Sequence, residues 1–402
     1  MNIMNNHLIV DRRFHHAVIR IYSLLPFRMQ DLATMTLLIE MLQNKARGYR
    51  SQDQIMTQCE SFYALDFDCS HTIMDEHILF SLTFRFVDEK IVNEKRLFEK
   101  ILRFLKRIVY DIDPLRFTNK LMKEQKMILI NKLKQYYDRP RYIVQHGLFQ
   151  ALDANWPISI SPYGTEEDIL RVTKEDLLDL HLRLVKAPRS YYYIGPYAKT
   201  RVKKAMERYF GTSISLPKRQ TYQMQVTEPI TIIKEKENLQ SELLFAYRLD
   251  QEDGREALHL FNDILGVSGN NRLFEEVREK RSLCYQISSS ILPYYHLLLV
   301  SVSVDQTKIE EAKFAVQDCL AHFRVKQKEL AEAKRMVRSE IVMQYDQAES
   351  ILMKQIRHEQ EEMDFSKASL LKRYRLVTLK QVNEIAKHLT YQGCYLLKGV
   401  KQ

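Results

Sequence analysis

Glycine is scarce in this chain of 402 residues, which contains 10 Gly and 10 Pro. Average usage of roughly 7% would give about 28 glycines in a chain of this length, so glycine-rich folds are disfavoured. Neither the G-x-x-x-x-G-K loop that cradles phosphate nor the dinucleotide-binding G-x-G-x-x-G turn is present. The standard nucleotide-binding fingerprints are therefore missing.

Cysteine is also scarce, and its placement excludes two kinds of site. The five residues are odd in number and never closer than ten residues, so neither a disulfide framework nor a CxxC zinc knuckle is indicated. A reducing compartment fits best. Asp11, Arg12 and Arg13 interrupt the N-terminal apolar segment, and no run approaches about 18 apolar residues. We therefore expect a cytoplasmic protein without a membrane partner.

Negative charge is in deficit, since 61 Lys and Arg face 51 Asp and Glu, a net charge of +10. Acidic partners are therefore plausible. The densest basic segments, 102–110 and 121–142, carry apolar residues at helical spacing. This pattern favours solvated faces of amphipathic helices over a nucleic-acid interface, so we expect no nucleic acid as a partner.

The chain contains one pattern twice, in the same order. In both copies a Val-Thr pair precedes an amphipathic helix, with Thr173 or Thr378 as the expected N-cap, and Asp176 completes an approximate capping box in the first copy. The segments that correspond between the copies are 37–42 with 260–265, 77–89 with 296–306, 172–185 with 377–390, and 190–197 with 394–400.

This repeat predicts an α+β fold of two homologous domains, each a mainly antiparallel β-sheet covered by helices. Each copy is expected to contain a strand, a helix, a short turn, a helix, two strands, a series of helices and a last strand. The expected boundaries are 1–214 for the first domain, 215–228 for a polar linker and 229–402 for the second domain. The helix-rich stretches 94–185 and 309–390 are expected to cover one face of each sheet.

Segment 266–290, GVSGNNRLFEEVREKRSLCYQISSS, resembles a characteristic stretch of the pitrilysin/insulinase family of zinc peptidases, which includes the mitochondrial processing peptidase. Segment 161–180 resembles the part of that family that precedes the last strand of its first domain. The two-copy organisation extends this resemblance over nearly the whole chain. The resemblance implies that each chain forms half of a clam-shell.

The family's first domain carries an inverted zinc motif, H-x-x-E-H, whose imidazoles bind zinc while the Glu acts as general base. Alignment of segment 31–45 with that helix places Thr36, Ile39 and Glu40 at the three motif positions. Thr36 is a poor ligand and Ile39 cannot be a base. A shift of register does not help, because no His lies between His16 and His71. The resemblance therefore implies no metal and no cofactor in this chain.

Two other segments imitate zinc motifs. The first, 71–77, has His71 and His77 six residues apart, the wrong spacing for one helix face, and we expect it to form a solvated turn before a strand. The second begins at His358 and reads HEQEEM on a highly charged helix, where we expect an exposed helical face.

Arg278 and Tyr285 match a pair that the family places seven residues apart in its second domain. In the family these two side chains reach the zinc site and hydrogen-bond the substrate carbonyl and the developing oxyanion. The chemistry needs a fixed positive fork and a neutral O–H donor where negative charge develops. Two alternatives remain open: Arg278 pairs with Glu275 on its own helix, and Tyr285 simply begins a buried strand.

Gly266 and Gly269 bracket a predicted turn between two helices, where positive φ angles are expected. Helix capping is the simpler interpretation. The resemblance offers a second one, a substrate-binding role in a loop that contacts peptide.

A chain with the Arg/Tyr pair but no metal site is half of a catalyst. Some members of the family are heterodimers in which one subunit carries zinc and the other supplies Arg and Tyr. The resemblance thus implies a protein inactive alone, the non-zinc subunit of a metalloendopeptidase, with zinc and H-x-x-E-H in a homologous partner and a peptide as substrate. Bacteriocin or modified-peptide maturation, or elongation-factor modification, are the processes it suggests by analogy. The alternative is a non-catalytic peptide-binding or assembly protein of the same fold.

Overall fold

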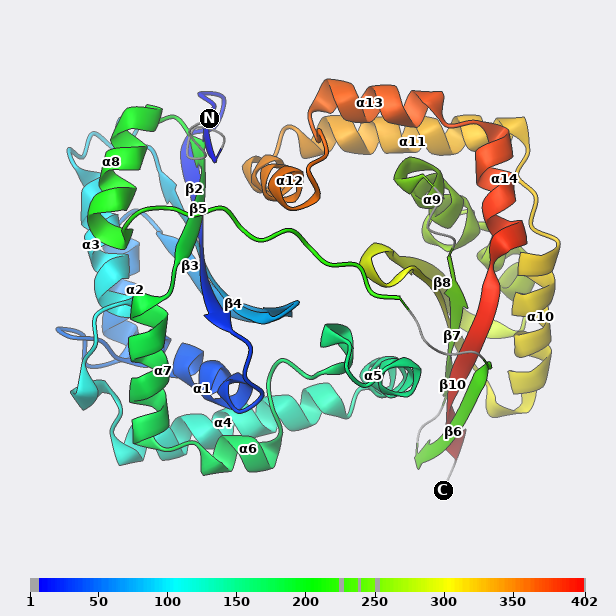
Figure 1. Ribbon diagram of the computed structural model, residues 1–402, viewed down its shortest axis with the longest axis horizontal. Coiled ribbons are helices and arrows are strands. Elements are labelled where there is room, and N and C mark those ends of the chain that lie inside the picture. Colours follow the sequence, from blue (N-terminus) through cyan, green and yellow to red (C-terminus); the bar gives the residue numbers. More distant parts are fainter. Residues whose placement is uncertain (1–6, 224–227, 238–239, 250–253, 401–402) are drawn as a thin grey trace. The chain divides into compact units, whose positions relative to one another are not determined.

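The computed structural model describes residues 7–223, 228–237, 240–249 and 254–400, which contain two five-stranded sheets (Figure 1). The first sheet has the order β1-β5-β2-β4-β3 and the second the order β6-β10-β7-β9-β8. The first consists of β1 (Leu8–Val10), β2 (His16–Pro26), β3 (Asp66–Met74), β4 (His77–Val87) and β5 (Arg189–Gly195). The second consists of β6 (Ile230–Glu237), β7 (Ser241–Arg248), β8 (Cys284–Leu292), β9 (Leu297–Val304) and β10 (Thr390–Val400).

The two sheets have the same topology. In each, the first and last strands in chain order pair in parallel, and the other neighbours pair antiparallel. The corresponding segments 77–89 and 296–306 contain β4 and β9, which hold the same place in their sheets. The predicted α+β class with two similar copies is confirmed. One strand per copy was missed, because two strands rather than one precede the first helix.

Helices occupy most of the remaining described chain. Those before the second sheet are α1 (Asp31–Asn44), α2 (Gln52–Ser61), α3 (Leu97–Val109), α4 (Asn119–Tyr137), α5 (Pro140–Leu152), α6 (Glu166–Arg171), α7 (Lys174–Lys186) and α8 (Lys199–Phe210). Those that follow are α9 (Arg255–Asn262), α10 (Ile309–Ala321), α11 (Gln327–Gln344), α12 (Ala348–Glu361), α13 (Lys367–Leu376) and α14 (Leu379–His388). Short 3-10 or π-helical turns form at Pro114–Arg116, Pro157–Ser159, Asp263–Val267, Phe274–Glu279, Pro293–Tyr295 and Gln306–Lys308.

The helices α7 and α14 begin where the Val-Thr pairs predict. The Thr173 hydroxyl accepts the backbone N–H of Asp176, whose carboxylate accepts the N–H of Thr173 at 2.8 Å. Thr378 and Gln381 form the same reciprocal pair, also at 2.8 Å. Both predicted N-caps are confirmed, and each contributes about 1 kcal/mol to helix stability.

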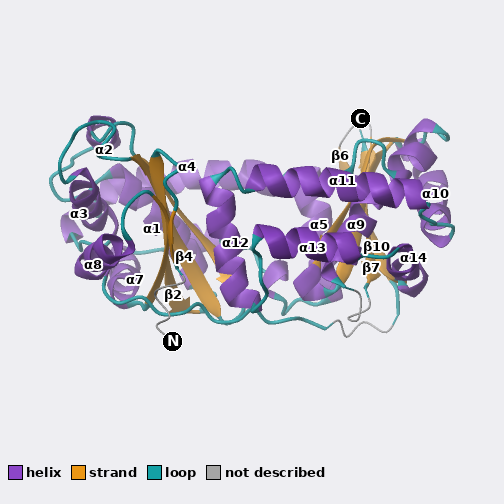
Figure 2. Cartoon of the chain, turned by 90° about the horizontal axis from the view of Figure 1, so that it is seen from above, coloured by secondary structure: helices purple, strands orange, loops and turns teal. Residues whose placement is uncertain are grey.

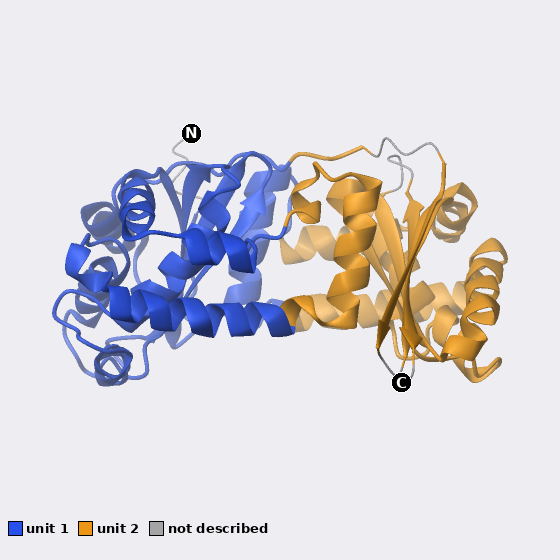
Figure 3. Cartoon of the chain, turned by 90° about the horizontal axis from the view of Figure 1, so that it is seen from below, with its two compact units in different colours: residues 1–135, 161–219, 344–365 blue, residues 136–160, 220–343, 366–402 orange. Residues whose placement is uncertain are grey.

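The described chain forms two compact units whose segments are discontinuous (Figure 3). Unit 1 comprises residues 1–135, 161–219 and 344–365, and unit 2 comprises 136–160, 220–343 and 366–402. The early segment 136–160, with α5, therefore belongs to the later sheet, and the late segment 344–365, with α12, belongs to the earlier one. The sequential boundaries at 214 and 229 do not describe this exchange.

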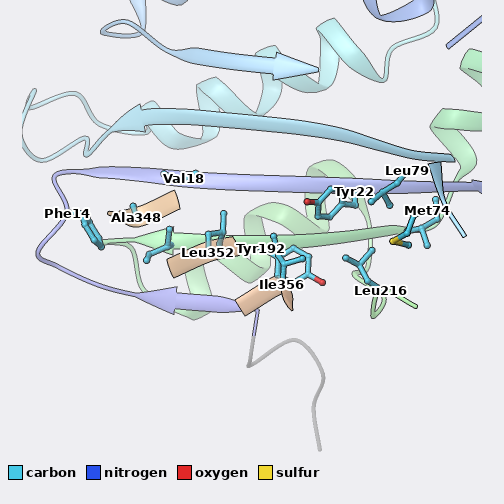
Figure 4. Packing of buried hydrophobic residues seen from close by; sticks show 12 residues of the cluster. Phe14, Val18, Tyr22, Met74, Leu79, Tyr192, Leu216, Ala348, Leu352 and Ile356 are labelled. Atoms are coloured by element: carbon cyan, nitrogen blue, oxygen red, sulfur yellow. The ribbon is translucent and has the colours of Figure 1, made fainter. Parts of the chain in front are cut away.

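In unit 1, α12 covers a face of the first sheet (Figure 4). Val18 and Tyr22 of β2 pack there against Leu352 and Ile356 of α12. The intervening β2 residues are buried on the opposite face, beside helices that include α1 and α7 (Figure 2). The sequence predicts a helical layer on one face of each sheet, and the structure adds a second layer, because helices cover both faces of the first sheet. A strand that is apolar on both faces requires cover on both.

In unit 2, α5 holds the corresponding place. Its apolar residues Leu148 and Phe149 pack against Leu244 of β7 and Tyr395 of β10. Among the helices that the structure describes, none is long and apolar enough to cross a membrane.

Candidate functional site

Arg278 and Tyr285 lie on consecutive elements of unit 2. Arg278 belongs to the π-helical turn Phe274–Glu279, and Tyr285 is the second residue of β8, an edge strand of the second sheet. The pairing of β8 with β9 is irregular between Cys284 and Gln286, so Tyr285 sits at a bulge. Bulges re-aim side chains at the edges of sheets.

The Arg278 side chain is exposed and has no anionic partner within the described residues. Its guanidinium carbon lies 4.8 Å from the centre of the Phe274 ring, at cation–π distance. Glu275 instead pairs with Lys280, Nζ to carboxylate oxygen at 3.1 Å. The alternative of an Arg278–Glu275 ion pair is not realised.

The π-helical winding explains this outcome. The Lys280 backbone N–H donates to the Glu275 carbonyl five residues earlier, at 3.0 Å. An i→i+5 turn brings Lys280 next to Glu275. In an α-helix the neighbours of Glu275 would be the residues three and four positions later, and Arg278 is the first of these. Arg278 is thereby left available for another partner.

The Tyr285 side chain is 51% exposed, and no group in the described parts of the chain bonds its hydroxyl. Leu283 and Ile287 on either side are buried. The alternative that Tyr285 begins a buried strand is therefore wrong. Both polar heads of the pair face away from the core of their unit.

Cys284 stands directly before Tyr285. Burial raises the pKa of its thiol to about 11, although the nearby Arg278 acts in the opposite direction. Because the thiolate is the nucleophilic form, a protonated Cys284 is unreactive at neutral pH.

The prediction of positive φ angles at Gly266 and Gly269 is wrong, since neither is among the glycines in that region. Gly266 is buried in the turn Asp263–Val267, and a Cβ there would lie 2.3 Å from Oγ of Ser289 on β8. Gly266 thus permits close packing of the turn on the strand. A Cβ on the exposed Gly269 would meet no described atom within 4 Å.

The three positions on α1 that would match a zinc motif have other roles. Thr36 Oγ1 donates to the Leu32 carbonyl at 2.9 Å, and Ile39 is buried. Glu40 pairs with Nζ of Lys132 on α4 at 2.9 Å. In the described residues, no group of three or more His, Cys, Asp and Glu side chains is placed to hold a metal ion. These residues do not fit zinc.

The two imitations of zinc motifs also have structural roles. His71 lies in strand β3 rather than in a solvated turn, and its Nε2 donates to the Pro162 carbonyl at 2.8 Å. Burial lowers the pKa of His71, so the ring is neutral at pH 7. The His358 ring donates through Nδ1 to the Met363 carbonyl at 2.6 Å. The helix that carries His358 packs on the first sheet, so the expectation of an exposed face is wrong.

A cavity of about 420 Å³ that the sequence did not predict lies in unit 1, lined by residues of β2, β3, β4 and α12. It brings together side chains of both signs, Arg20, Arg85 and Arg219 with Asp66 and Asp68. The signal in the sequence was the polar alternation along β3, which places Asp66 and Asp68 on one face of the strand. A lining of both charges suits groups that carry donors and acceptors, as peptides do.

Comparison with known proteins identifies the relationship. Residues 171–337 match the family model described as the peptidase M16 inactive domain. The chain is 20% identical over 408 residues to a probable inactive metalloprotease, YmfF, of Bacillus subtilis, covering 98% of this chain and 96% of that protein. It is 22% identical to the uncharacterized zinc protease YmxG of the same species, over 68% of this chain and 69% of that one.

A third relative is similar over a shorter region. The antilisterial bacteriocin subtilosin biosynthesis protein AlbE of Bacillus subtilis is 28% identical over 144 residues, which cover 35% of this chain and 36% of AlbE.

Solved structures share the fold. A conserved protein from Enterococcus faecalis has a TM-score of 0.88 at 18% identity, covering 98% of this chain and 96% of that one. A peptidase M16 inactive domain from Pseudomonas fluorescens has a TM-score of 0.78 at 19% identity, covering 98% and 95%. The resemblance to the pitrilysin/insulinase peptidases, the M16 family, is thus confirmed, and residues 171–337 are the part that matches the model of that family's inactive domain.

Proposed function

We propose that this chain is the zinc-less subunit of a heterodimeric metallopeptidase and that Arg278 and Tyr285 act in the zinc site of a homologous partner. The observation that carries the proposal is the state of the pair. Both side chains are exposed, and within the described chain neither polar head has a hydrogen-bond or ion-pair partner, although the Arg278 guanidinium contacts the Phe274 ring. Leaving a guanidinium and a phenol free on consecutive elements makes both available to a second molecule.

The chemistry follows from the two groups. The partner's zinc, held by an H-x-x-E-H motif, would activate the water that hydrolyses the peptide bond. Arg278 would bind the substrate carbonyl through its planar fork, and the neutral hydroxyl of Tyr285 would donate to the oxygen that becomes negative. The chain alone would be inactive, because Thr36, Ile39 and Glu40 do not fit zinc.

The edge position of Tyr285 suits an extended substrate. A peptide that pairs with an exposed sheet edge is held by main-chain hydrogen bonds, and β8 is such an edge. Gly266 lies beneath β8 and would support this strand through packing, while Gly269 lies on the exposed surface. A direct substrate contact by Gly266 would require the buried turn to open, so we assign it the supporting role.

The test is reconstitution with a zinc-bearing homologue that carries H-x-x-E-H. Arg278→Ala should lower kcat/KM, because it removes about 2–4 kcal/mol of transition-state stabilisation, as for loss of an oxyanion-hole donor. Tyr285→Phe should lower kcat more than it raises KM. The matched control is Lys280→Ala, which removes a neighbouring charge whose partners in the described part of the chain are Glu275 and Glu276.

An unchanged kcat/KM in the Arg278→Ala pair, with zinc bound and the subunits associated, would refute the catalytic role. Loss of association instead would move Arg278 to the subunit contact.

Maturation of a bacteriocin or another modified peptide is the process that we propose for the pair. The support is the local similarity to AlbE, whose name assigns that protein to subtilosin biosynthesis. The scattered cysteines favour a cytoplasmic site for this work. Mass spectrometry of a precursor peptide with and without the pair would reveal the bond that is cleaved.

A second candidate is a peptide-binding or assembly protein that cleaves nothing. The description of the matched domain as inactive and the name of the relative YmfF favour it. It predicts association with a homologous chain or a peptide, but no hydrolysis in any reconstituted pair.

A further inference from the structure

A groove of about 570 Å³ lies in unit 2 between α11 and α13, which run side by side (Figure 2). The residues that line it include five cations and no carboxylate. The cations are Lys334, Arg335, Arg338, Lys372 and Arg375. A one-sign cluster of this kind is costly unless anions neutralise it.

Most of these charges are unneutralised in the described residues. Arg338, Lys372 and Arg375 are exposed and form no ion pair there, whereas Arg335 pairs with Glu332 at 3.8 Å. Lys334 has a structural role, since its Nζ donates to the Arg375 carbonyl at 3.0 Å at the end of α13. Three cations thus remain for an external ligand, and Arg335 can join them, because its long pair with Glu332 is exposed to solvent.

The floor of the groove is apolar. By floor we mean the apolar part of the lining, which is Ala368, Leu371 and Tyr374 of α13 together with the methylene stems of the cations. Positions 368, 371, 372 and 375 recur at the i, i+3, i+4 and i+7 spacing of one helix face. At about 1.5 Å per residue the groove therefore runs for roughly 10 Å along α13.

This shape discriminates between anions. A single phosphate would occupy one end and leave the floor uncovered. A nucleic-acid backbone would pair with the cations but would leave Leu371 without an apolar partner. A polypeptide segment with carboxylates on one side and apolar side chains on the other would satisfy both parts of the groove.

We propose that the groove between α11 and α13 is a docking site for an acidic, amphipathic polypeptide segment of a partner protein. The carboxylates of the segment bind Arg335, Arg338, Lys372 and Arg375, and its apolar side chains cover the floor. This site goes beyond the Arg278/Tyr285 pair and stands whether or not the pair is catalytic.

The experiment uses the full chain and a fluorescein-labelled synthetic peptide of about 12 residues, with Glu and Leu at helical spacing. Fluorescence anisotropy should show saturable binding that weakens as salt rises. The double substitution Arg338→Glu with Lys372→Glu should weaken it by about tenfold or more, because two attractions become repulsions. The neutral pair Arg338→Gln with Lys372→Gln should have a smaller effect in the same direction.

The matched control is Lys123→Glu with Lys204→Glu, two exposed positions of unit 1, which changes the net charge equally. It should leave the affinity within about twofold, and thermal unfolding should show that all variants remain folded. Equal weakening in the control would reduce the binding to attraction by net charge and overturn the proposal. So would equal affinity for the peptide with Gln in place of Glu, or tighter binding of a single-stranded oligonucleotide that displaces the peptide.

Discussion

The helices α12 and α5 hold corresponding places on the two sheets, and their contacts are chemically different. Each comes from the half of the chain opposite to the sheet that it covers. The contact of α12 includes a polar cluster around Glu359, whereas that of α5 rests on close apolar and aromatic packing. The exchange of helices is common to both copies, so it does not depend on one particular set of contacts.

The polar cluster joins three parts of unit 1. Glu359 accepts the hydroxyl of Tyr192 on β5 and lies 3.1 Å from Nε2 of His7. It also accepts the backbone N–H of Leu216 at 3.2 Å. Because these donors satisfy the carboxylate, a charged side chain is tolerated at a largely buried position.

The apolar contact in unit 2 depends on size. A Cβ on Gly147 of α5 would lie 2.2 Å from a ring carbon of Tyr395 on β10, so the helix approaches the strand as closely as glycine allows. Trp156 extends the same cluster onto Tyr295, with ring centres 5.2 Å apart. The difference teaches that a sheet can hold a helix from the other half of the chain either by hydrogen bonds to a buried carboxylate or by close apolar packing.

The largest effect should come from the apolar anchors of the two helices. Leu352 on α12 is 1% exposed and Leu148 on α5 is 0% exposed, so Leu→Ala at either should cost about 3–4 kcal/mol of unfolding free energy. Hydrogen exchange should show that the lost stability belongs to the sheet that the altered helix covers. Leu352→Ala should speed exchange in β5 and spare β10, and Leu148→Ala should do the reverse. If Leu352→Ala instead speeds exchange in β10 and Leu148→Ala in β5, each helix stabilises the sheet of its own half of the chain, and the assignment of α12 and α5 to the opposite sheets is wrong.

A smaller effect is expected at Glu359, and it should depend on pH. Burial acts to raise the pKa of Glu359, but the hydrogen bonds from His7 and Tyr192 outweigh it and hold the pKa below its ordinary value of 4.5. The carboxylate therefore stabilises the fold above that ordinary value, and this contribution is lost as the pH falls through the folded-state pKa.

Glu359→Ala should thus cost about 2–3 kcal/mol near pH 7 and much less in acid, as measured by denaturant unfolding across pH 3–7. Glu362→Gln is the control, since the ion-pair partner of Glu362 among the described residues is the exposed Lys218. A deficit at Glu359 that did not shrink in acid would mean that the carboxylate acts through its shape.

Local signals in the sequence predicted much of the fold. Apolar periodicity placed segments 77–89 and 296–306 as corresponding strands, and hydroxyls at Thr173 and Thr378 marked helix starts, because both depend on neighbours along the chain. The exchange of α5 and α12 could not be predicted in this way. An amphipathic stripe shows that a helix buries one face, but it does not show which of two similar sheets provides the cover.

The candidate site divides along the same line. The loss of zinc ligands at Thr36, Ile39 and Glu40 was evident from residue types alone. The free state of Arg278 was not, because it depends on a π-helical turn that gives Glu275 to Lys280. The prediction of a positive φ at Gly266 was wrong for a related reason. What requires glycine at this position is the close approach of Ser289 on β8, which leaves no room for a Cβ, and not the backbone conformation of the turn.

The smallest of the three effects should be at Gly147, and it tests packing by shape directly. Gly147→Ala should cost about 1–2 kcal/mol, because the Tyr395 ring or α5 must shift to accept a methyl group that helix propensity alone would welcome. Gly269→Ala is the control, since a Cβ there meets no described atom within 4 Å, and it should change stability little. Thermal unfolding of the two variants measures the difference. A Gly147→Ala protein as stable as the control would show that the contact between α5 and β10 has room for a methyl group. Close packing would then not distinguish α5 from α12, which is held by the hydrogen bonds of Glu359.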